Sequence, residues 1–253
     1  MGFNPLFHNS AHAKPAHNSA HHSRVFSNLN GFLVIDKPKT WTSFDVVAKI
    51  RGKLHPKKIG HAGTLDPLAT GVLVLCLGEA TKLSEKVMGT EKEYVGEITL
   101  GATSRTDDAE GPIVPSEKAT ECPIAEVEKI LQSFVGTFGQ MPPQFSAKKV
   151  DGDRAYKLAR KGKPVDLKPA QVTIHRIEML DYKWPKIKVR IVSGKGFYVR
   201  SLARDVGEKL GVGGYLSDLK RTRVGIFSIE RAVSVEEASE KNLISLSVAG
   251  HLK

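Results

Sequence analysis

The sequence predicts an α+β fold in which helices pack on a mixed β-sheet. Apolar strands and amphipathic helices alternate irregularly along the chain, and several strands are near neighbours, which disfavours a doubly wound parallel sheet. Of the 253 residues, 40% are hydrophobic and 26% charged, so the chain can bury a substantial core. No apolar run approaches the roughly 18 residues that a membrane span needs. We therefore expect a soluble, cytoplasmic protein.

The first predicted elements follow an N-terminal tail. Residues 1–30 are rich in His, Asn, Ser and Ala and contain no acidic residue, which predicts a disordered segment. Its five histidines have an irregular spacing that matches no metal-binding pattern. The apolar run at 31–38 predicts a strand, which Pro38 ends, and Ser43 is the predicted cap of an amphipathic helix. A glycine-punctuated turn follows at 60–71.

The remaining elements are predicted from the same signals of periodicity and turn residues. They are, in order, a buried strand at 71–78, a strand at 92–101, a helix at 123–135, an outward-reaching insertion with a short basic helix at 139–168, strands at 170–182 and 186–193, a helix from about 197 to 210, a strand near 222–230 and a short acidic helix at 234–241.

The charge of the chain is concentrated in one third of its length. The net charge is +11; residues 148–231 contain 21 basic and nine acidic residues, whereas the rest contains 17 basic and 18 acidic ones. A stretch such as KKVDGDRAYKLARKGK, with Tyr156 among its cations, is typical of a surface that follows phosphates. A well-solubilised exposed helix is the alternative. Cys76 and Cys122 lie far apart without partner histidines, so neither a disulfide nor a zinc site is predicted.

The turn GHAGTLDPLATG holds one carboxylate, Asp66, between three glycines and a proline. A carboxylate framed in this way is held at one place and partly desolvated, which suits catalysis. On spacing alone, a plain Asp-Pro turn is the simpler interpretation. A phosphate loop is disfavoured, because the Gly-Lys-Ser/Thr ending is missing and an acidic residue would repel phosphate.

A second unusual segment, SGKGFYVRSLARDVG, leads from glycines into a helix. Tyr198 and Arg200 are two residues apart, so they point the same way on an extended lead-in. The arginine could pair with a carboxylate and keep it ionised, and the tyrosine could meet a base. The alternative interpretation of this segment is a capped amphipathic helix with an ordinary aromatic core residue. Tyr94, on its alternating strand, could likewise be an ordinary core residue.

Six segments occur in order between Gly31 and about Phe227: LVIDKPKTWTSFDVV, KKIGHAGTLDPLATGVLVLCLGEATK, KEYVGEITLGATSRTDDAEG, QMPPQFSAKKVDGDRAYKLARKG, GKGFYVRSLARDVG and LSDLKRTRVGIF. Together they resemble the TruB family of tRNA pseudouridine synthases. The resemblance implies a mixed, largely antiparallel sheet flanked by helices, with the insertion at about 139–168 as a thumb on the RNA. It also implies a catalytic domain at 31–231 and, at 232–253, a short segment without the additional RNA-binding domain of many members.

The resemblance also assigns the site. It makes Asp66 the catalytic residue, with Arg200 and Tyr198 beside it, and places His61, Tyr94, Tyr198 and Leu219 around the uridine. The candidates for RNA contact in the thumb are Lys148, Lys149, Arg154, Lys157, Arg160 and Lys161.

The implied reaction isomerises the T-loop uridine at position 55 of tRNA. The base must leave the stack, after which its N1–C1′ bond breaks and a C5–C1′ bond forms. Asp66 could attack C1′ or base C6, or assist a glycal intermediate, and the residues do not choose between these routes. We expect no cofactor or metal, a monomer, and tRNA (the T-stem-loop) as partner. Rival functions are a ribosomal- or guide-RNA-directed synthase, a non-catalytic RNA-folding protein, and a base-excising glycosylase.

Overall fold

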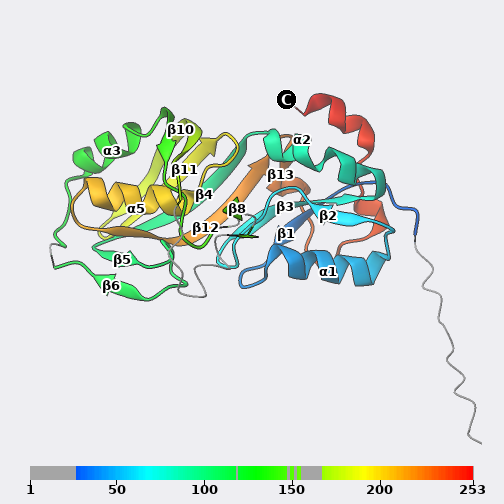
Figure 1. The fold of residues 1–253 in the computed structure, drawn as a ribbon, viewed down its shortest axis with the longest axis horizontal. Helices are drawn as coiled ribbons and strands as arrows, with labels where there is room; N and C mark the ends of the chain where they lie inside the picture. The colour runs from blue at the N-terminus through cyan, green and yellow to red at the C-terminus, as the bar shows by residue number, and fades with distance from the viewer. Residues whose placement is uncertain (1–26, 118, 147–148, 151–152, 155–166, 253) are drawn as a thin grey trace, which may run out of the picture.

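The computed structural model describes residues 27–117, 119–146, 149–150, 153–154 and 167–252, and its elongated body is built on one large sheet (Figure 1). The strands of this sheet are β1 (Gly31–Lys37), β2 (Ile59–His61), β3 (Thr70–Leu77), β4 (Lys92–Leu100), β7 (Gly136–Gln140), β10 (Ala170–Lys183), β11 (Lys186–Ser193), β12 (Gly214–Val224) and β13 (Phe227–Ser228). Their order is β1-β3-β12-β4-β11-β10-β7, with β2 beside β3 and β13 beside β12. Only β3 and β12 pair in parallel within the described sheet, so the predicted α+β class with a largely antiparallel sheet is confirmed.

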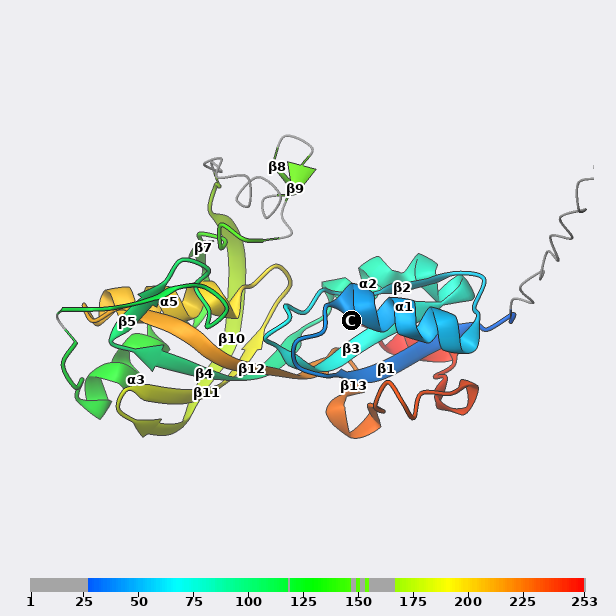
Figure 2. The ribbon, with the colours of Figure 1, turned by 90° about the horizontal axis from the view of Figure 1, so that it is seen from below.

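One half of the molecule is built around β1 and β3, which are buried on both faces. Their sequences are continuous apolar runs, as expected for strands covered on two sides. Leu33 and Ile35 face the core that includes the helix α1 (Ser43–Leu54). Phe32 and Val34 face a second core, covered by η1 (Gly78–Leu83), α2 (Ser84–Gly89) and the C-terminal segment (Figures 1 and 2).

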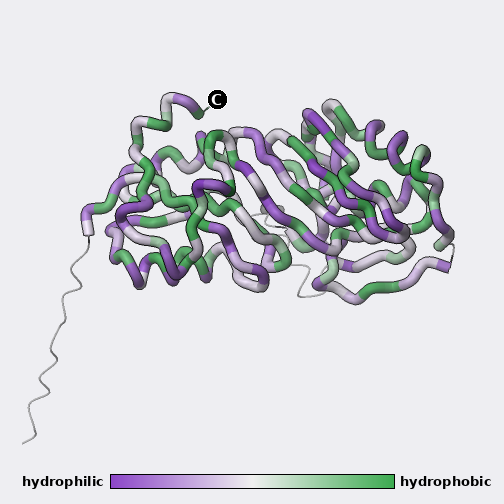
Figure 3. Tube along the Cα trace, turned by 180° about the vertical axis from the view of Figure 1, so that it is seen from behind, coloured by the Kyte–Doolittle hydropathy of each residue, from purple (hydrophilic) through white to green (hydrophobic). Residues whose placement is uncertain are grey.

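The other half is built on β4, β11 and the first part of β12, where buried residues alternate with more exposed ones. This period-two pattern buries one face of the sheet, against which α5 (Val199–Lys209) packs. The helix α3 (Ile124–Gln132) joins the same core through Val127 and Leu131. Figure 3 shows hydrophilic and hydrophobic residues alternating along the trace. None of the helices in the described part of the chain is long and apolar enough to cross a membrane.

Two short ladders lie outside the main sheet. One joins β5 (Ala102–Ser104) to β6 (Ile113–Pro115), and the other joins β8 (Lys149–Val150) to β9 (Asp153–Arg154). The second ladder belongs to the predicted thumb and stands away from the body of the molecule (Figure 2). The predicted basic helix of the thumb lies outside the described residues, as do Lys148, Lys157, Arg160 and Lys161.

The N-terminal boundaries differ from the prediction in two places. Ser27 forms a bridge with Pro56 and the Asn30 side chain accepts from the Glu79 amide at 2.9 Å, so residues 27–30 belong to the fold and not to the tail. The cap of α1 is Thr42, which exchanges capping-box hydrogen bonds with Asp45. Ser43 is the first helical residue, and its hydroxyl faces another partner, described below.

The C-terminal predictions need two further corrections. The strand predicted near 222–230 begins at Gly214, because β-bulges near Leu216 and Arg221 interrupt the alternation that would have marked it. No helix spans 234–241: a single turn, closed by the Ala238 amide on the Ser234 carbonyl, precedes η3 (Glu240–Asn242). So short a segment is a marginal helix, and backbone groups of Val233 pair with β1 instead. The short helices η2 (Ile229–Arg231) and η4 (Leu246–His251) complete the chain.

Candidate active site

The turn that carries Asp66 joins β2 to β3 and is tied to the start of α1. The Ser43 hydroxyl donates to the Leu65 carbonyl oxygen at 3.1 Å and accepts from the Leu65 amide at 2.8 Å. The Ala69 amide donates to the Asp66 carbonyl oxygen at 3.1 Å. Leu65 and Leu68 are buried, so packing and hydrogen bonds both fix the backbone around Asp66.

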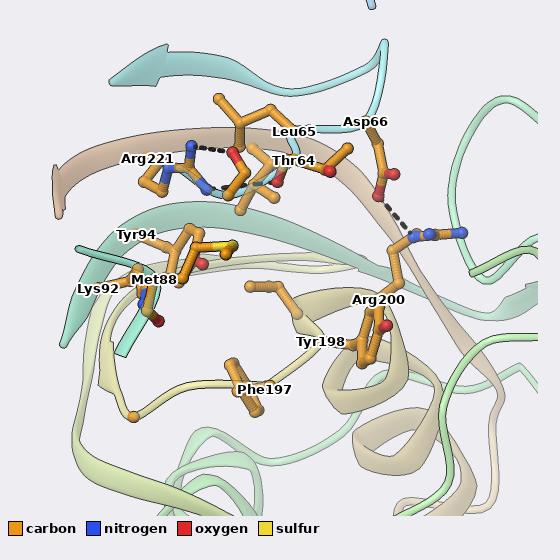
Figure 4. Close-up of a pocket in the computed structure, with 15 residues that line it drawn as sticks. Thr64, Leu65, Asp66, Met88, Lys92, Tyr94, Phe197, Tyr198, Arg200 and Arg221 are labelled. Carbon is orange, nitrogen blue, oxygen red and sulfur yellow. Dashed lines mark hydrogen bonds and ion pairs between the residues drawn. The ribbon is translucent and has the colours of Figure 1, made fainter. Parts of the chain in front are cut away.

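Arg200, the second residue of α5, forms an ion pair with Asp66 (Figure 4). Its Nε lies 2.9 Å from the Asp66 Oδ2, without the alignment of a hydrogen bond, so the contact is mainly electrostatic. The Arg200 side chain is 7% exposed and the Asp66 side chain 41% exposed. The terminal nitrogens of Arg200 donate to the carbonyl oxygens of Thr106 (3.1 Å) and Phe145 (3.0 Å). Arg200 is thus held by three different segments, and the carboxylate remains open to the pocket.

A second carboxylate, that of Asp108, lies behind Arg200. Its Oδ2 is 3.5 Å from Arg200 NH1, and its side chain is only 3% exposed. The Thr106 hydroxyl and the Glu110 amide donate to its Oδ1 at 2.5 and 3.0 Å. Arg200 therefore sits between two carboxylates. Sequence reasoning missed Asp108, because in TDDAEG nothing marks which acidic residue turns inward.

Next to this ion pair is a pocket of about 330 Å³, the size of a small-ligand site. Five of the predicted site residues line it: Asp66, Tyr94, Tyr198, Arg200 and Leu219. They come from the β2–β3 turn, β4, the start of α5 and β12, which are far apart in sequence (Figure 4). His61 lies at the end of β2, opposite Leu75 of β3, and is not among the residues that line this pocket.

Of the two pocket tyrosines, Tyr94 is buried and Tyr198 is half-buried. Burial raises the pKa of Tyr94, and the nearby guanidinium of Arg221 opposes this shift. Burial also raises the pKa of Tyr198. Tyr198 is the extended residue before α5; its amide donates to the Gln140 side chain at 2.9 Å, and that side chain donates to the Tyr198 carbonyl at 3.1 Å. Both hydroxyls therefore stay protonated at neutral pH.

Sequence reasoning also missed two buried lysines around the site. Lys92 lines the pocket, where its Nζ donates to the carbonyl oxygens of Thr90 (2.5 Å) and Met88. Burial, helped by nearby cations, lowers the pKa of Lys92 to about 8. Lys37 is wholly buried, and its Nζ donates to the carbonyl oxygens of Trp41 (2.6 Å) and Pro67 (3.4 Å). Burial lowers its pKa to about 8 as well, against the pull of the Asp66 carboxylate. In the sequence, Lys37 is marked only as a lysine at the end of an apolar strand, and Lys92 only as a lysine at the start of an alternating one.

Of the thumb residues predicted to contact RNA, Lys149 and Arg154 lie opposite each other in the β8–β9 ladder. Among the described residues, no three His, Cys, Asp or Glu side chains are grouped as they would be around a metal ion.

Two family models match the chain. One, described as TruB family pseudouridylate synthase (N terminal domain), matches residues 51–199. The other, described as tRNA pseudouridylate synthase B C-terminal domain, matches residues 200–245. In this structure the second region contains most of α5 together with β12, so it continues the same sheet and core.

Curated proteins and solved structures are also similar to the chain. The tRNA pseudouridine synthase B of Parabacteroides distasonis is 46% identical over 85% of this chain and 95% of its own length. That of Phocaeicola vulgatus is 51% identical over 82% and 91%. A chain in a Cbf5-Nop10-Gar1 complex aligns with a TM-score of 0.65 at 30% identity over 82% of this chain. One in an H/ACA RNP bound to a substrate RNA containing 2′-deoxyuridine aligns with a TM-score of 0.62 at 27% identity. The chain spans about half the length of those two chains, 53% and 51%.

Proposed function

Because this chain belongs to the TruB family of pseudouridine synthases, we propose that it isomerises the T-loop uridine, position 55 in tRNA numbering, to pseudouridine. The single observation that carries the proposal is the Asp66 carboxylate, paired with a buried Arg200 and open to the pocket. Catalysis of this kind needs one ionised carboxylate at a fixed place, beside a cavity that can receive a base.

The reaction needs Asp66 as its central group. The bond between N1 and C1′ of the uridine breaks, the base turns within the pocket, and C5 bonds to C1′ while the C5 proton is lost and N1 gains one. The product has the same atoms as the substrate. The carboxylate acts as nucleophile at C1′ or C6, or assists removal of a proton from the sugar on the way to a glycal. In each route the carboxylate acts in its ionised form, and the guanidinium of Arg200 lies 2.9 Å from it.

The pocket walls suit a base that has left its stack. Extrusion of a base costs a few kcal/mol, and stacking on an aromatic ring offsets about 1–3 kcal/mol of this. Tyr94 provides the ring, and Leu219 provides an apolar wall on the neighbouring strand. Tyr198 is placed to contact the base or the sugar with its protonated hydroxyl. We assign His61 to the surrounding RNA, because it lies on the adjacent β2 and outside the pocket lining.

Binding of tRNA would use the basic third of the chain, residues 148–231. This segment contains the β8–β9 ladder of the thumb, which stands off the body, together with the partly exposed Lys220 and Arg223 of β12. Folded RNA loops present bases that can be splayed out, and cations along the backbone hold them in register.

The test maps pseudouridine chemically at every position of an unmodified tRNA transcript after incubation with the wild type or with Asp66→Asn. Pseudouridine at position 55 with the wild type alone would support the proposal. Modification at another position, or in another RNA, would instead support a ribosomal- or guide-RNA-directed synthase. Release of free uracil with an abasic site would indicate a glycosylase, and equal modification by Asp66→Asn would exclude the assigned role of Asp66.

A further inference from the structure

Arg221 is a buried cation of β12 to which the proposed chemistry gives no role. It lies opposite Tyr94 of β4 on one side and Gly71 of β3 on the other, at the place where the sheet has its parallel pair. The residue is 2% exposed, yet it also contributes to the lining of the pocket. Burial of a guanidinium is costly unless its N–H groups are hydrogen-bonded. The hydrogen-bond partners of Arg221 therefore show which parts of the structure it connects.

The partners of Arg221 are backbone oxygens of the segment that carries Asp66. Nε donates to the Val72 carbonyl at 2.8 Å. NH2 and NH1 donate to the Gly63 carbonyl at 3.0 Å and the Thr64 carbonyl at 3.3 Å (Figure 4). The guanidinium also interacts electrostatically with Tyr94, which lies opposite Arg221 in the pairing of β4 with β12. One planar group thus joins the residues before Asp66 to the first part of β3.

Two glycines with a positive φ lie beside Arg221. Gly71 has φ +95°, and a Cβ at this position would lie 2.2 Å from the Arg221 carbonyl oxygen. Gly63 has φ +112° and approaches the guanidinium, with NH1 3.6 Å from the place of a Cβ. The two glycines of the turn therefore allow β3 and the turn to close on Arg221.

We propose that Arg221 is a positioning residue: its fork of hydrogen bonds sets the place of the Asp66 carboxylate, and its guanidinium supports the ring of Tyr94 on the neighbouring strand. The inference rests on the proposed function for its catalytic consequence. It requires the guanidinium itself, because the single nitrogen of a lysine cannot donate to the carbonyl oxygens of Gly63, Thr64 and Val72 at the same time. Misplacement of a catalytic group by about 1 Å costs roughly 100-fold in rate.

A purely structural role predicts something different. If Arg221 only stabilised the sheet, a folded variant would react at the wild-type rate. Its backbone amides would then exchange hydrogen faster throughout the molecule. The two roles separate in Arg221→Lys and Arg221→Gln, compared with Arg51→Lys. Arg51 also donates to a backbone carbonyl, that of Ile59 at 3.3 Å, but lies on α1 outside the pocket and outside residues 148–231.

The first measurement is the single-turnover rate with saturating tRNA, well below the melting temperature of each variant. For Arg221→Lys and Arg221→Gln we expect a fall in rate of about 100-fold with an unchanged Kd for tRNA. Arg51→Lys should react as the wild type does. A folded Arg221→Lys that retains the wild-type rate would overturn the proposal.

The second measurement is amide hydrogen exchange, which needs no activity. In Arg221→Lys two amides of the turn should exchange at least about tenfold faster: that of Leu65, which donates to the Ser43 hydroxyl, and that of Ala69, which donates to the Asp66 carbonyl oxygen. The amide of Val189 in β11 should stay protected. Faster exchange throughout the chain, or failure of both variants to fold, would overturn the proposal in favour of a structural role. If the wild type modifies no tRNA, the proposed function fails, but the exchange pattern still decides whether Arg221 positions the turn.

Discussion

The Asp108 carboxylate belongs to the electrostatic environment of Arg200, although it does not line the pocket. Asp108→Asn removes an anion 3.5 Å from the guanidinium and keeps the shape of the side chain. We expect the single-turnover rate to fall about tenfold, equivalent to roughly 1.4 kcal/mol, because Arg200 is then less firmly oriented toward Asp66. Glu79→Gln, which breaks an exposed ion pair with Lys82, is the control. An unchanged rate in Asp108→Asn would show that Arg200 needs only one carboxylate.

Lys92 makes the stability of the protein depend on pH in a particular direction. Burial lowers its pKa from 10.5 to about 8, so between pH 8 and 10.5 the unfolded chain binds more protons than the folded one. The free energy of unfolding of the wild type should therefore rise over this window relative to Lys92→Met, by on the order of 3 kcal/mol. Urea unfolding at several pH values measures the difference, and Lys188→Met, on the exposed face of β11, is the control. If the difference in free energy of unfolding between the wild type and Lys92→Met stayed constant from pH 8 to 10.5, this prediction would be wrong.

The start of α1 and the Asp66 turn form a single unit through Ser43, and two neighbouring substitutions test this. Thr42→Ala removes the helix cap, and Ser43→Ala removes both hydrogen bonds with Leu65. Each should lower the free energy of unfolding by about 1–2 kcal/mol, measured in urea. Only Ser43→Ala should also lower the single-turnover rate, because it alone loosens the turn. Equal rates in the two folded variants would mean that the turn does not depend on α1.

The contact between β3 and β12 tolerates no side chain at its closest point. Gly71→Ala places a methyl group 2.2 Å from the Arg221 carbonyl oxygen at a positive φ, so it should lower the free energy of unfolding by several kcal/mol. Gly52→Ala in α1 meets open space and should raise it by roughly 0.5–1 kcal/mol. Thermal melting measures both effects: the melting temperature should fall in Gly71→Ala and rise in Gly52→Ala. A small change in the melting temperature of Gly71→Ala would mean that β3 can move away from β12.

Sequence periodicity predicted β1, β3, β4 and β11 well, since each is an uninterrupted apolar or alternating run. It failed for β12, where bulges break the alternation and the charged Arg221 is buried. The same limit applies to the site. The resemblance to a family pointed to Asp66, whereas Asp108, Lys37 and Arg221 were not assigned, because the groups that satisfy a buried charge come from distant segments.

Across the whole molecule, cations are unevenly distributed, and this predicts how tRNA binding responds to salt. If residues 148–231 bind phosphates, the Kd for tRNA should rise steeply between about 50 and 200 mM KCl. Lys149→Gln combined with Arg154→Gln should reduce the slope of log Kd against log salt by about one to two. Lys49→Gln, an exposed change on α1 outside this segment, is the control. A Kd that hardly responds to salt would contradict binding through phosphates.

The position of β12 has a consequence for how the protein is made. The strand lies between β3 and β4 but follows both by more than 100 residues in the chain. A nascent polypeptide that has reached α5 already contains Asp66 and Arg200, yet the inner edges of β3 and β4 have no partner. Activity should therefore arise only late in translation, and the unfinished chain on the ribosome is the form that most needs a chaperone.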